Sequence, residues 1–160
     1  MKITRIYTDG ACSSNPGPGG YSAIVLLKNK VETISGYESE TTNNRMELRG
    51  VIEGLNYFLN LVYQGYKCDK LEIYSDSAYV VNAIVQNWIQ NWKLNKFKTT
   101  KGDDIKNVDL WLRLDEQLEE LKFIDLPLMF IKIKGHNGNN FNEMADKVAK
   151  NEIVKNKKEG

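Results

Sequence analysis

The chain has 160 residues, 41% of them hydrophobic and 27% charged, a balance typical of one globular domain around one core. No apolar run approaches the roughly 18 residues that cross a bilayer, and no signal peptide is recognisable, so we expect neither a membrane protein nor a secreted one. The formal net charge of +1 shows no overall basic character, so any binding to nucleic acid has to depend on local patches. We therefore expect a cytoplasmic monomer with two reduced cysteines, Cys12 and Cys68, and no membrane partner.

Three strands are predicted at the start of the chain. Residues 3–9 are rich in Ile, Thr and Tyr, residues 21–28 contain an unbroken apolar run, and residues 31–37 follow a tight connection. Residues 12–20 consist of turn-forming residues and are predicted to be a loop. Because the connections are short, the three strands are expected to form an antiparallel meander.

Helical spacing begins at about residue 44 and continues to residue 62. A strand at residues 71–74, a helix at 77–85, a short helix and loop at 88–106, a helix at 109–121, a strand at 128–134 and a helix at 140–153 follow. The order βββαβαααβα predicts an α/β fold in which helices flank a five-stranded mixed sheet. Residues 1–154 would form the single domain, and the basic tail at residues 155–160 would fray.

Four acidic residues beside apolar positions are candidates for a metal site. Asp9 lies at the end of the first strand, Glu47 in the first turns of the long helix, Asp76 after the fourth strand and Asp146 in the last helix. Carboxylates that converge away from water repel one another unless a cation is present. Oxygen ligands suit Mg²⁺ or Mn²⁺, whereas the sequence offers no set of cysteines and histidines for zinc.

Each of these acids also has a simpler interpretation. Asp9 could start a turn, and Asp76 could cap the helix that follows it. Glu47 fits a capping box with Asn44, and Asp146 could be a solvated helix residue. Spacing alone therefore leaves the metal site as a hypothesis.

Four local motifs occur in a fixed order along the chain. They are TDGACSSNPGPGG at residues 8–20, TNNRMEL at 42–48, SDSAYV at 75–80, and KGHNG at 134–138 followed by Asn142-Glu143 and Ala145-Asp146. The set resembles the bacterial type 1 ribonuclease H family over residues 3–150. The resemblance implies the ribonuclease H-like fold and an endonuclease that hydrolyses the RNA strand of an RNA–DNA hybrid.

The resemblance also implies roles for the acids. Asp9, Glu47, Asp76 and Asp146 would hold two Mg²⁺ or Mn²⁺ ions around the scissile phosphate, one ion activating water and the other stabilising the leaving 3′ oxygen. The products would carry a 5′-phosphate and a 3′-hydroxyl. His136, the only histidine, would steer the water or move protons near neutral pH.

The same resemblance places the hybrid along the glycine-rich loop and the start of the long helix. Cys12, through its backbone, and Asn43 would lie along the RNA strand together with Glu47. Asn15 and Thr42 would hold a DNA phosphate, and Asn44 offers further donors and acceptors. Because these contacts are to the backbone, we expect cutting that is nearly independent of sequence.

Residues 88–101 resemble the basic handle of the family, which grips the DNA side of the hybrid. Aromatic faces alternate there with cations, and the candidates are Trp88, Trp92, Lys93, Lys96 and Lys98. Residues 93–106 contain five lysines against two aspartates, a local excess of three positive charges. A solvated charged loop is the alternative interpretation. Trp111 is expected in the core instead.

One position departs from the family, because Ala78 stands where a glutamine commonly contacts the RNA minor groove, and substrate preference is expected to differ. Three other interpretations are possible. A DNA nuclease or integrase-like enzyme of the same fold would cut DNA duplex. A non-catalytic hybrid-binding module would have degenerate acids, and a domain released from a reverse transcriptase would be a trimmed piece of a longer chain.

Overall fold

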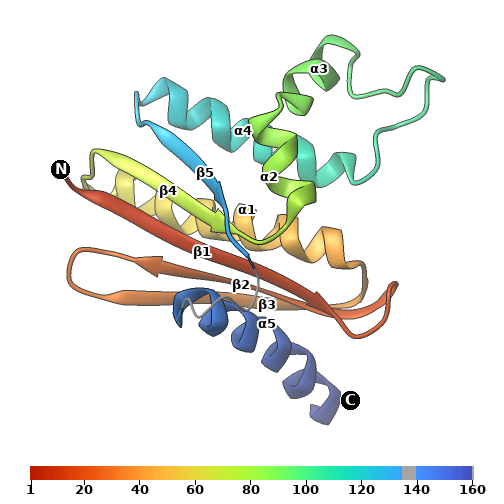
Figure 1. The fold of residues 1–160 in the computed structure, drawn as a ribbon, viewed down its shortest axis with the longest axis horizontal. Coiled ribbons are helices and arrows are strands. Elements are labelled where there is room, and N and C mark those ends of the chain that lie inside the picture. Colours follow the sequence, from red (N-terminus) through yellow and green to blue (C-terminus); the bar gives the residue numbers. More distant parts are fainter. Residues whose placement is uncertain (135–139, 160) are drawn as a thin grey trace.

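The computed structural model describes residues 1–134 and 140–159 of the chain. Figure 1 shows the ten elements, whose bounds are β1 Ile3–Cys12, β2 Gly17–Leu26, β3 Val31–Thr41, α1 Asn43–Tyr63, β4 Lys70–Ser75, α2 Ala78–Val85, α3 Trp88–Leu94, α4 Val108–Phe123, β5 Leu128–Lys132 and α5 Asn140–Glu159. The predicted order βββαβαααβα is confirmed. No helix within the described ranges combines the length and the apolar character needed to cross a membrane.

The five strands form one mixed sheet in the order β3-β2-β1-β4-β5. β1 pairs with β2 and β2 with β3 in antiparallel fashion, which confirms the predicted meander. β1 pairs with β4 and β4 with β5 in parallel, as the helical crossovers require. The carboxyl ends of β1 and β4 therefore meet at the same edge of the sheet.

The glycine-rich segment differs from its prediction as a loop. β2 already begins at Gly17, which pairs with Thr41 of β3, and only residues 13–16 connect it to β1. Cys12 lies opposite Gly19, and Ala11 lies opposite Gly20. Glycines are found in the strand at positions 19 and 20 because α1 and α5 approach the sheet there so closely that a side chain would not fit.

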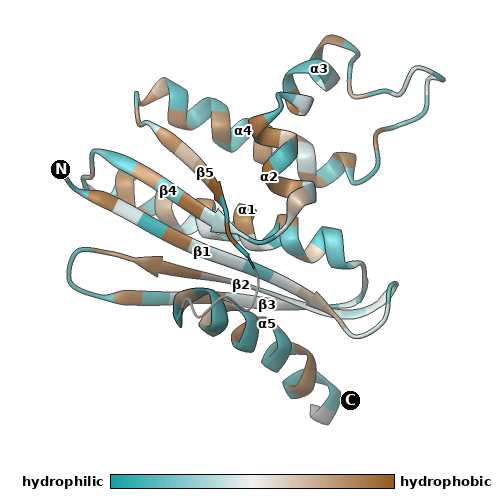
Figure 2. Cartoon of the chain, in the orientation of Figure 1, coloured by the Kyte–Doolittle hydropathy of each residue, from teal (hydrophilic) through white to brown (hydrophobic). Residues whose placement is uncertain are grey.

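Alternating residues of the strands point to two different cores. Ile6 belongs to the larger cluster, which lies between the sheet and helices α1, α2 and α4, whereas its neighbour Tyr7 belongs to a smaller cluster under α5. Figure 1 shows α1 and α5 on opposite faces of the sheet. Trp111 is fully buried in the larger cluster, as predicted. Figure 2 shows that hydrophobic residues line the inner elements, while the loop between α3 and α4 is mostly hydrophilic.

Helix α5 lies against β2 at a position where the strand has almost no side chains. A Cβ atom on Gly20 would lie 2.9 Å from the Cβ of Glu152 and closer still to the carbonyl oxygen of Ala149. Two residues along, the buried hydroxyl of Ser22 donates a 2.6 Å hydrogen bond to the carbonyl oxygen of Ala145. These contacts fix the distance between α5 and the sheet.

The last helix is longer than predicted. It continues to Glu159, whereas the sequence pattern ended it near Ile153 and left residues 155–160 to fray. Within the added turns, the side-chain amide of Asn156 donates to the carbonyl oxygen of Glu152 at 2.7 Å, and Lys155 pairs with the carboxylate of Glu152 at 3.2 Å. Local bonds of this kind extend the helix beyond its apolar stripe.

We expect Gly20→Ala to lower the free energy of unfolding by about 1–3 kcal/mol, because the added methyl group forces α5 away from β2. Urea denaturation measures the effect. Ser39→Ala, at an exposed position of the neighbouring strand β3, is the control and should change stability little. Equal midpoints for the two variants would contradict the close packing of α5 on β2.

Candidate metal centre

Three carboxylates converge at the edge where β1 and β4 end. Asp9 is near the end of β1, Glu47 is in α1, and Asp76 directly follows β4. Each offers an oxygen atom such that all three atoms lie within 4.8 Å of one another. The register explains the meeting of two of them, because Tyr7 lies opposite Tyr74 in the parallel pair and both acids follow two residues later.

Gly10 brings the third carboxylate to this edge. A Cβ atom at this position would lie 2.8 Å from the Cβ of Met46 and closer still to the backbone of Met46 and Glu47. β1 therefore passes directly against the first turns of α1, and Glu47 is placed beside Asp9. A second close approach occurs at Gly50, where a Cβ atom would lie 3.0 Å from the carbonyl oxygen of Asp9.

The helix caps decide between the alternative interpretations of two acids. The side chain of Thr42 caps α1, and that of Ser77 caps α2. Glu47 is thus not part of a capping box, and Asp76 is not the cap of the helix that follows it. Both carboxylates belong to the cluster instead.

Burial makes this cluster electrostatically unfavourable without a cation. Burial raises the pKa of the Asp9 carboxyl to about 7, and the charge of Asp76 adds to the rise, although a 2.9 Å hydrogen bond from the backbone N–H of Gly10 opposes it. Burial also raises the pKa of Glu47 well above its ordinary value, with Asp9 as the next contributor. Glu47 is only 5% exposed, and its buried Oε2 atom has no hydrogen-bond partner among the described residues. An orphaned carboxylate oxygen beside two further carboxylates fits a hard divalent cation.

Asp146 lies close to this cluster without joining it. Its charge contributes to the raised pKa of Asp9, yet its own Oδ2 atom forms a 2.9 Å ion pair with Nζ of Lys150. Lys150 is not part of any of the four sequence motifs. The signal that could have found it is the spacing of four residues from Asp146 on the same helix face.

The predicted substrate residues of the loop and of α1 are neighbours. Oδ1 of Asn15 accepts a 3.1 Å hydrogen bond from the backbone N–H of Asn43, and Sγ of Cys12 lies 3.5 Å from the carbonyl oxygen of Thr41. Thr42 caps the helix at the same place. The partly buried Asn44 is the second residue of α1. The structure thus places Cys12, Asn15, Thr42, Asn43 and Asn44 around the amino end of α1.

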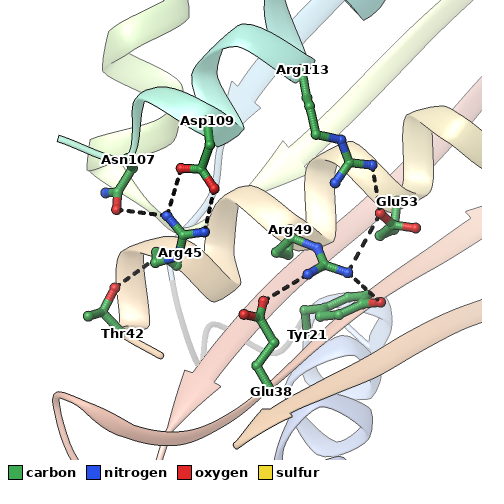
Figure 3. A network of polar contacts seen from close by, with 9 residues as sticks. All are labelled: Tyr21, Glu38, Thr42, Arg45, Arg49, Glu53, Asn107, Asp109 and Arg113. Atoms are coloured by element: carbon green, nitrogen blue, oxygen red, sulfur yellow. Dashed lines mark hydrogen bonds and ion pairs between the residues drawn. The ribbon is translucent and has the colours of Figure 1, made fainter. Parts of the chain in front are cut away.

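Figure 3 shows how ion pairs hold this end of α1 to its neighbours. Both terminal nitrogens of Arg45 bind the carboxylate of Asp109 at the start of α4, at 2.9 and 2.7 Å. One turn later, Arg49 binds Glu38 of β3 at 2.8 Å and lies over the ring of Tyr21. A two-pronged arginine–carboxylate pair fixes orientation as well as distance, so α4 and α1 are held in register beside the cluster.

The aromatic residues of α3 face inward more than predicted. Trp88 and Trp92 are both partly buried and pack against the larger core cluster. Trp92 also meets Trp111 edge to face, with 5.1 Å between the ring centroids. These rings anchor α3 to the domain, and only part of each remains for a ligand.

The three candidate lysines at residues 93, 96 and 98 differ in how accessible their charges are to a ligand. Nζ of Lys93 forms ion pairs with Asp115 at 2.9 Å and Glu119 at 3.0 Å, both on α4. Lys98 is paired with an aspartate of the same loop. Lys96 is exposed. Its charge is therefore the most accessible of the three.

Two further residues were singled out through the family resemblance, Ala78 and His136. Ala78, in place of the family glutamine, is the exposed first residue of α2. His136 lies outside the described residues.

We expect Asp9→Asn to stabilise the cation-free protein by roughly 1–3 kcal/mol at pH 8, because it removes a buried charge. The folded-state pKa of about 7 exceeds the ordinary 3.8, so this carboxyl favours folding at low pH and loses that contribution as the pH rises from 3.8 to about 7. The increase in the free energy of unfolding that Asp9→Asn produces should accordingly become smaller as the pH falls towards 4. Chemical denaturation in the presence of a chelator, repeated across this pH range, measures it.

Asp103→Asn removes an aspartate charge at an exposed position and is the matched control. It should leave stability nearly unchanged across the same pH range. A loss of stability in Asp9→Asn at pH 8 would show that the Asp9 carboxylate is compensated within the protein.

Known proteins resemble this chain along nearly its whole length. A family model described as RNase H matches residues 1–154. A protein named Ribonuclease H from Caldicellulosiruptor saccharolyticus is 47% identical over 153 residues, which cover 96% of this chain and 97% of that protein. Another of the same name, from Acetivibrio thermocellus, is 44% identical over 158 residues and covers 99% of both chains.

Solved structures show the same fold. A crystal structure described as a type 1 RNase H with the type 2 active-site motif superposes with a TM-score of 0.78 at 25% identity, covering 97% of this chain and 74% of that one. An RNase H1 in complex with an RNA/DNA hybrid superposes with a TM-score of 0.65 at 22% identity, covering 96% and 98% of the two chains. With its carboxylate cluster at the ends of β1 and β4 and its match along nearly the whole sequence, the chain belongs to the RNase H family.

Proposed function

We propose that this protein hydrolyses the RNA strand of RNA–DNA hybrids with two bound divalent cations, Mg²⁺ or Mn²⁺, and leaves a 5′-phosphate and a 3′-hydroxyl. The observation that carries the proposal is the convergence of Asp9, Glu47 and Asp76 from three separate elements. The names of the close sequence relatives support the activity. The crystal structure of an RNase H1 with a bound hybrid supports the substrate.

The acids divide into two groups by their surroundings. Asp9, Glu47 and Asp76 would hold one cation, since their oxygen atoms already lie together and one of them is orphaned. Asp146 would complete a second cation site with Asp9, because the charge of Asp146 raises the pKa of Asp9. When bound, such a pair of cations supplies an activated water and stabilises the leaving oxygen of the phosphodiester.

The residues around the amino end of α1 would bind the hybrid beside the cations. The side-chain amide nitrogens of Asn15, Asn43 and Asn44 are donors suited to phosphate and ribose oxygens. Recognition of the ribose 2′-hydroxyl by such groups is what separates RNA from DNA. The bond between Asn15 and the backbone of Asn43 orients both residues before a substrate arrives.

The basic segment after α3 would bind the other strand through its backbone. Lys96 is proposed as its main contact, with Lys98 beside it, because Lys93 is already neutralised by two carboxylates. The partly exposed rings of Trp88 and Trp92 would add contacts to sugars. Binding through lysines to phosphates makes the affinity dependent on salt.

The auxiliary role of His136 in proton transfer remains a prediction. So do the cytoplasmic location and the monomeric state. The effect of Ala78 on substrate preference is likewise untested.

We expect metal-dependent cutting of the RNA strand in an end-labelled RNA–DNA hybrid, and no cutting of single-stranded RNA, RNA duplex or DNA duplex. Asp9→Asn should reduce the rate by a factor of at least about a hundred while hybrid binding persists, because it removes a cation ligand. Gel analysis of the labelled products measures both strands. Asp125→Asn, at the exposed turn between α4 and β5, is the control and should cut as the parent does.

Two outcomes would contradict the proposed function. Cutting of DNA duplex would favour a nuclease of the integrase type. Binding of the hybrid without cutting in either Mg²⁺ or Mn²⁺ would favour a non-catalytic binding module.

We expect Lys96→Gln to weaken hybrid binding and to lower the slope of log affinity against log salt by about one, because one phosphate contact is lost. Lys93→Gln should have a smaller effect, since Asp115 and Glu119 already neutralise its charge. Fluorescence anisotropy at several salt concentrations measures both. Lys28→Gln, at the hairpin between β2 and β3, removes an exposed lysine at the opposite end of the sheet and should leave the slope unchanged. Equal slopes for the Lys96 and Lys28 variants would exclude the basic segment from binding.

A further inference from the structure

The clustered acids of β1 and β4 are preceded by two other side-chain pairs that connect the same strands. Two pairs are in register in the sheet, and the acids follow two residues later. Alternate residues of a strand lie on the same face of a sheet, so the pairs succeed one another along that face. In order towards the carboxyl ends, this cross-strand row consists of Arg5 with Glu72, Tyr7 with Tyr74, and Asp9 with Asp76.

Attraction holds the first pair of the cross-strand row. Nε of Arg5 donates a 3.0 Å hydrogen bond to Oε1 of the buried Glu72, and Nζ of Lys70 lies 3.2 Å from the other carboxylate oxygen. The hydroxyl of Tyr74 donates a 2.8 Å hydrogen bond to the same Oε1 atom. The Glu72 carboxylate therefore connects the first pair of the row to the second.

The second pair is a stack of two aromatic rings. The ring centroids of Tyr7 and Tyr74 are 4.5 Å apart and the ring planes differ by 9°. Tyr7 is buried and also meets Phe141, in the first turns of α5, at a centroid distance of 5.6 Å. Stacked rings lose their contact when the strands that carry them move apart. The stack thus holds β1, β4 and the start of α5 at one spacing.

Repulsion acts on the third pair. After burial, the charge of Asp76 is the next cause of the raised pKa of Asp9. The last residues of β1 and β4 that pair in the sheet are Tyr7 and Tyr74. The stacked rings therefore lie at the point where backbone pairing between the two strands ends and the carboxylates begin.

We infer that Tyr7 and Tyr74 are positioning residues, whose stacked rings hold Asp9 and Asp76 at the separation needed to share a cation before the cation binds. Without the rings, the end of β4 would move away from β1 under the repulsion of the two acids. Part of the binding free energy of the cation would then be used to bring them together again. The inference rests on the proposed cation-dependent function and assigns a role to two rings that are not ligands.

The test measures Mn²⁺ binding to the full-length protein without substrate, by isothermal calorimetry. Tyr74→Val and Tyr74→Leu both remove the ring, whereas Tyr74→Phe keeps the stack and removes only the hydroxyl. Tyr66→Val is the matched control. Tyr66 is also partly buried, meets the ring of Phe58 and forms a hydroxyl hydrogen bond with Thr4, but it follows the end of α1 that is opposite to Glu47.

We expect Mn²⁺ binding to be roughly three- to tenfold weaker in Tyr74→Val and Tyr74→Leu, within the range that one stacked aromatic pair accounts for. Tyr74→Phe and Tyr66→Val should bind as the parent does. With the hybrid, the two ring-deleting variants should show a lower kcat at limiting Mn²⁺, recovery at saturating Mn²⁺ and an unchanged KM. Unchanged Mn²⁺ binding in both of them would overturn the inference, as would an equal loss in Tyr74→Phe or in Tyr66→Val.

A measurement without any cation separates this inference from the proposed function. In chelator at pH 8, Asp9→Asn should raise the free energy of unfolding less in the Tyr74→Val background than in the parent, because the acids have already moved apart there. An equal or larger rise would overturn the inference. Failure of the proposed function looks different, because the parent itself would then show no Mn²⁺ binding that Asp9→Asn removes.

Discussion

The mutual repulsion of three converging carboxylates, two of them buried, is the constraint on which the rest of this structure depends. Asp9 and Glu47 lie where water is largely excluded, Asp76 is partly buried beside them, and one oxygen atom of Glu47 has no partner among the described residues. Such an arrangement is unfavourable on its own and persists only where the surrounding packing determines it. Many residues of β1, β4 and α1, the elements that carry or precede these acids, are accordingly buried.

The packing that opposes this repulsion depends on residues without bulk. Gly10 and Gly50 let α1 lie directly on β1, and Gly20 does the same for α5 on β2. In addition, the ion pair between Arg45 and Asp109 holds the start of α1 against α4. The residues at the amino end of α1 that are proposed to bind the substrate are thereby held by the same contacts that position Glu47. The same contacts thus stabilise the fold and position the proposed site, so a substitution in α1 or α4 that breaks them would affect both.

The fold could be predicted in outline because hydrophobic periodicity is a local property. The spacing of apolar residues found the helices and strands in their correct order, and short connections predicted the meander. Prediction from local patterns failed where tertiary contacts override local preference. Gly17, Gly19 and Gly20 have the composition of a loop, yet they pair in β2, and at Gly19 and Gly20 the neighbouring helices α1 and α5 leave no room for a side chain. The end of α5 was placed too early because its last turns depend on polar contacts of Glu152 rather than on an apolar stripe.

The sequence by itself determined which residues were candidates, since the motifs around Asp9, Glu47, Asp76 and Asp146 are readable as strings and resemble one family. Only the tertiary structure decided how they are used. It removed the capping interpretations by giving those roles to Thr42 and Ser77. It separated Asp146 from the other acids by pairing it with Lys150, and it neutralised Lys93 while leaving Lys96 exposed. The reason is physical: burial and charge pairing depend on residues distant in the chain, and no local pattern records which of them will meet.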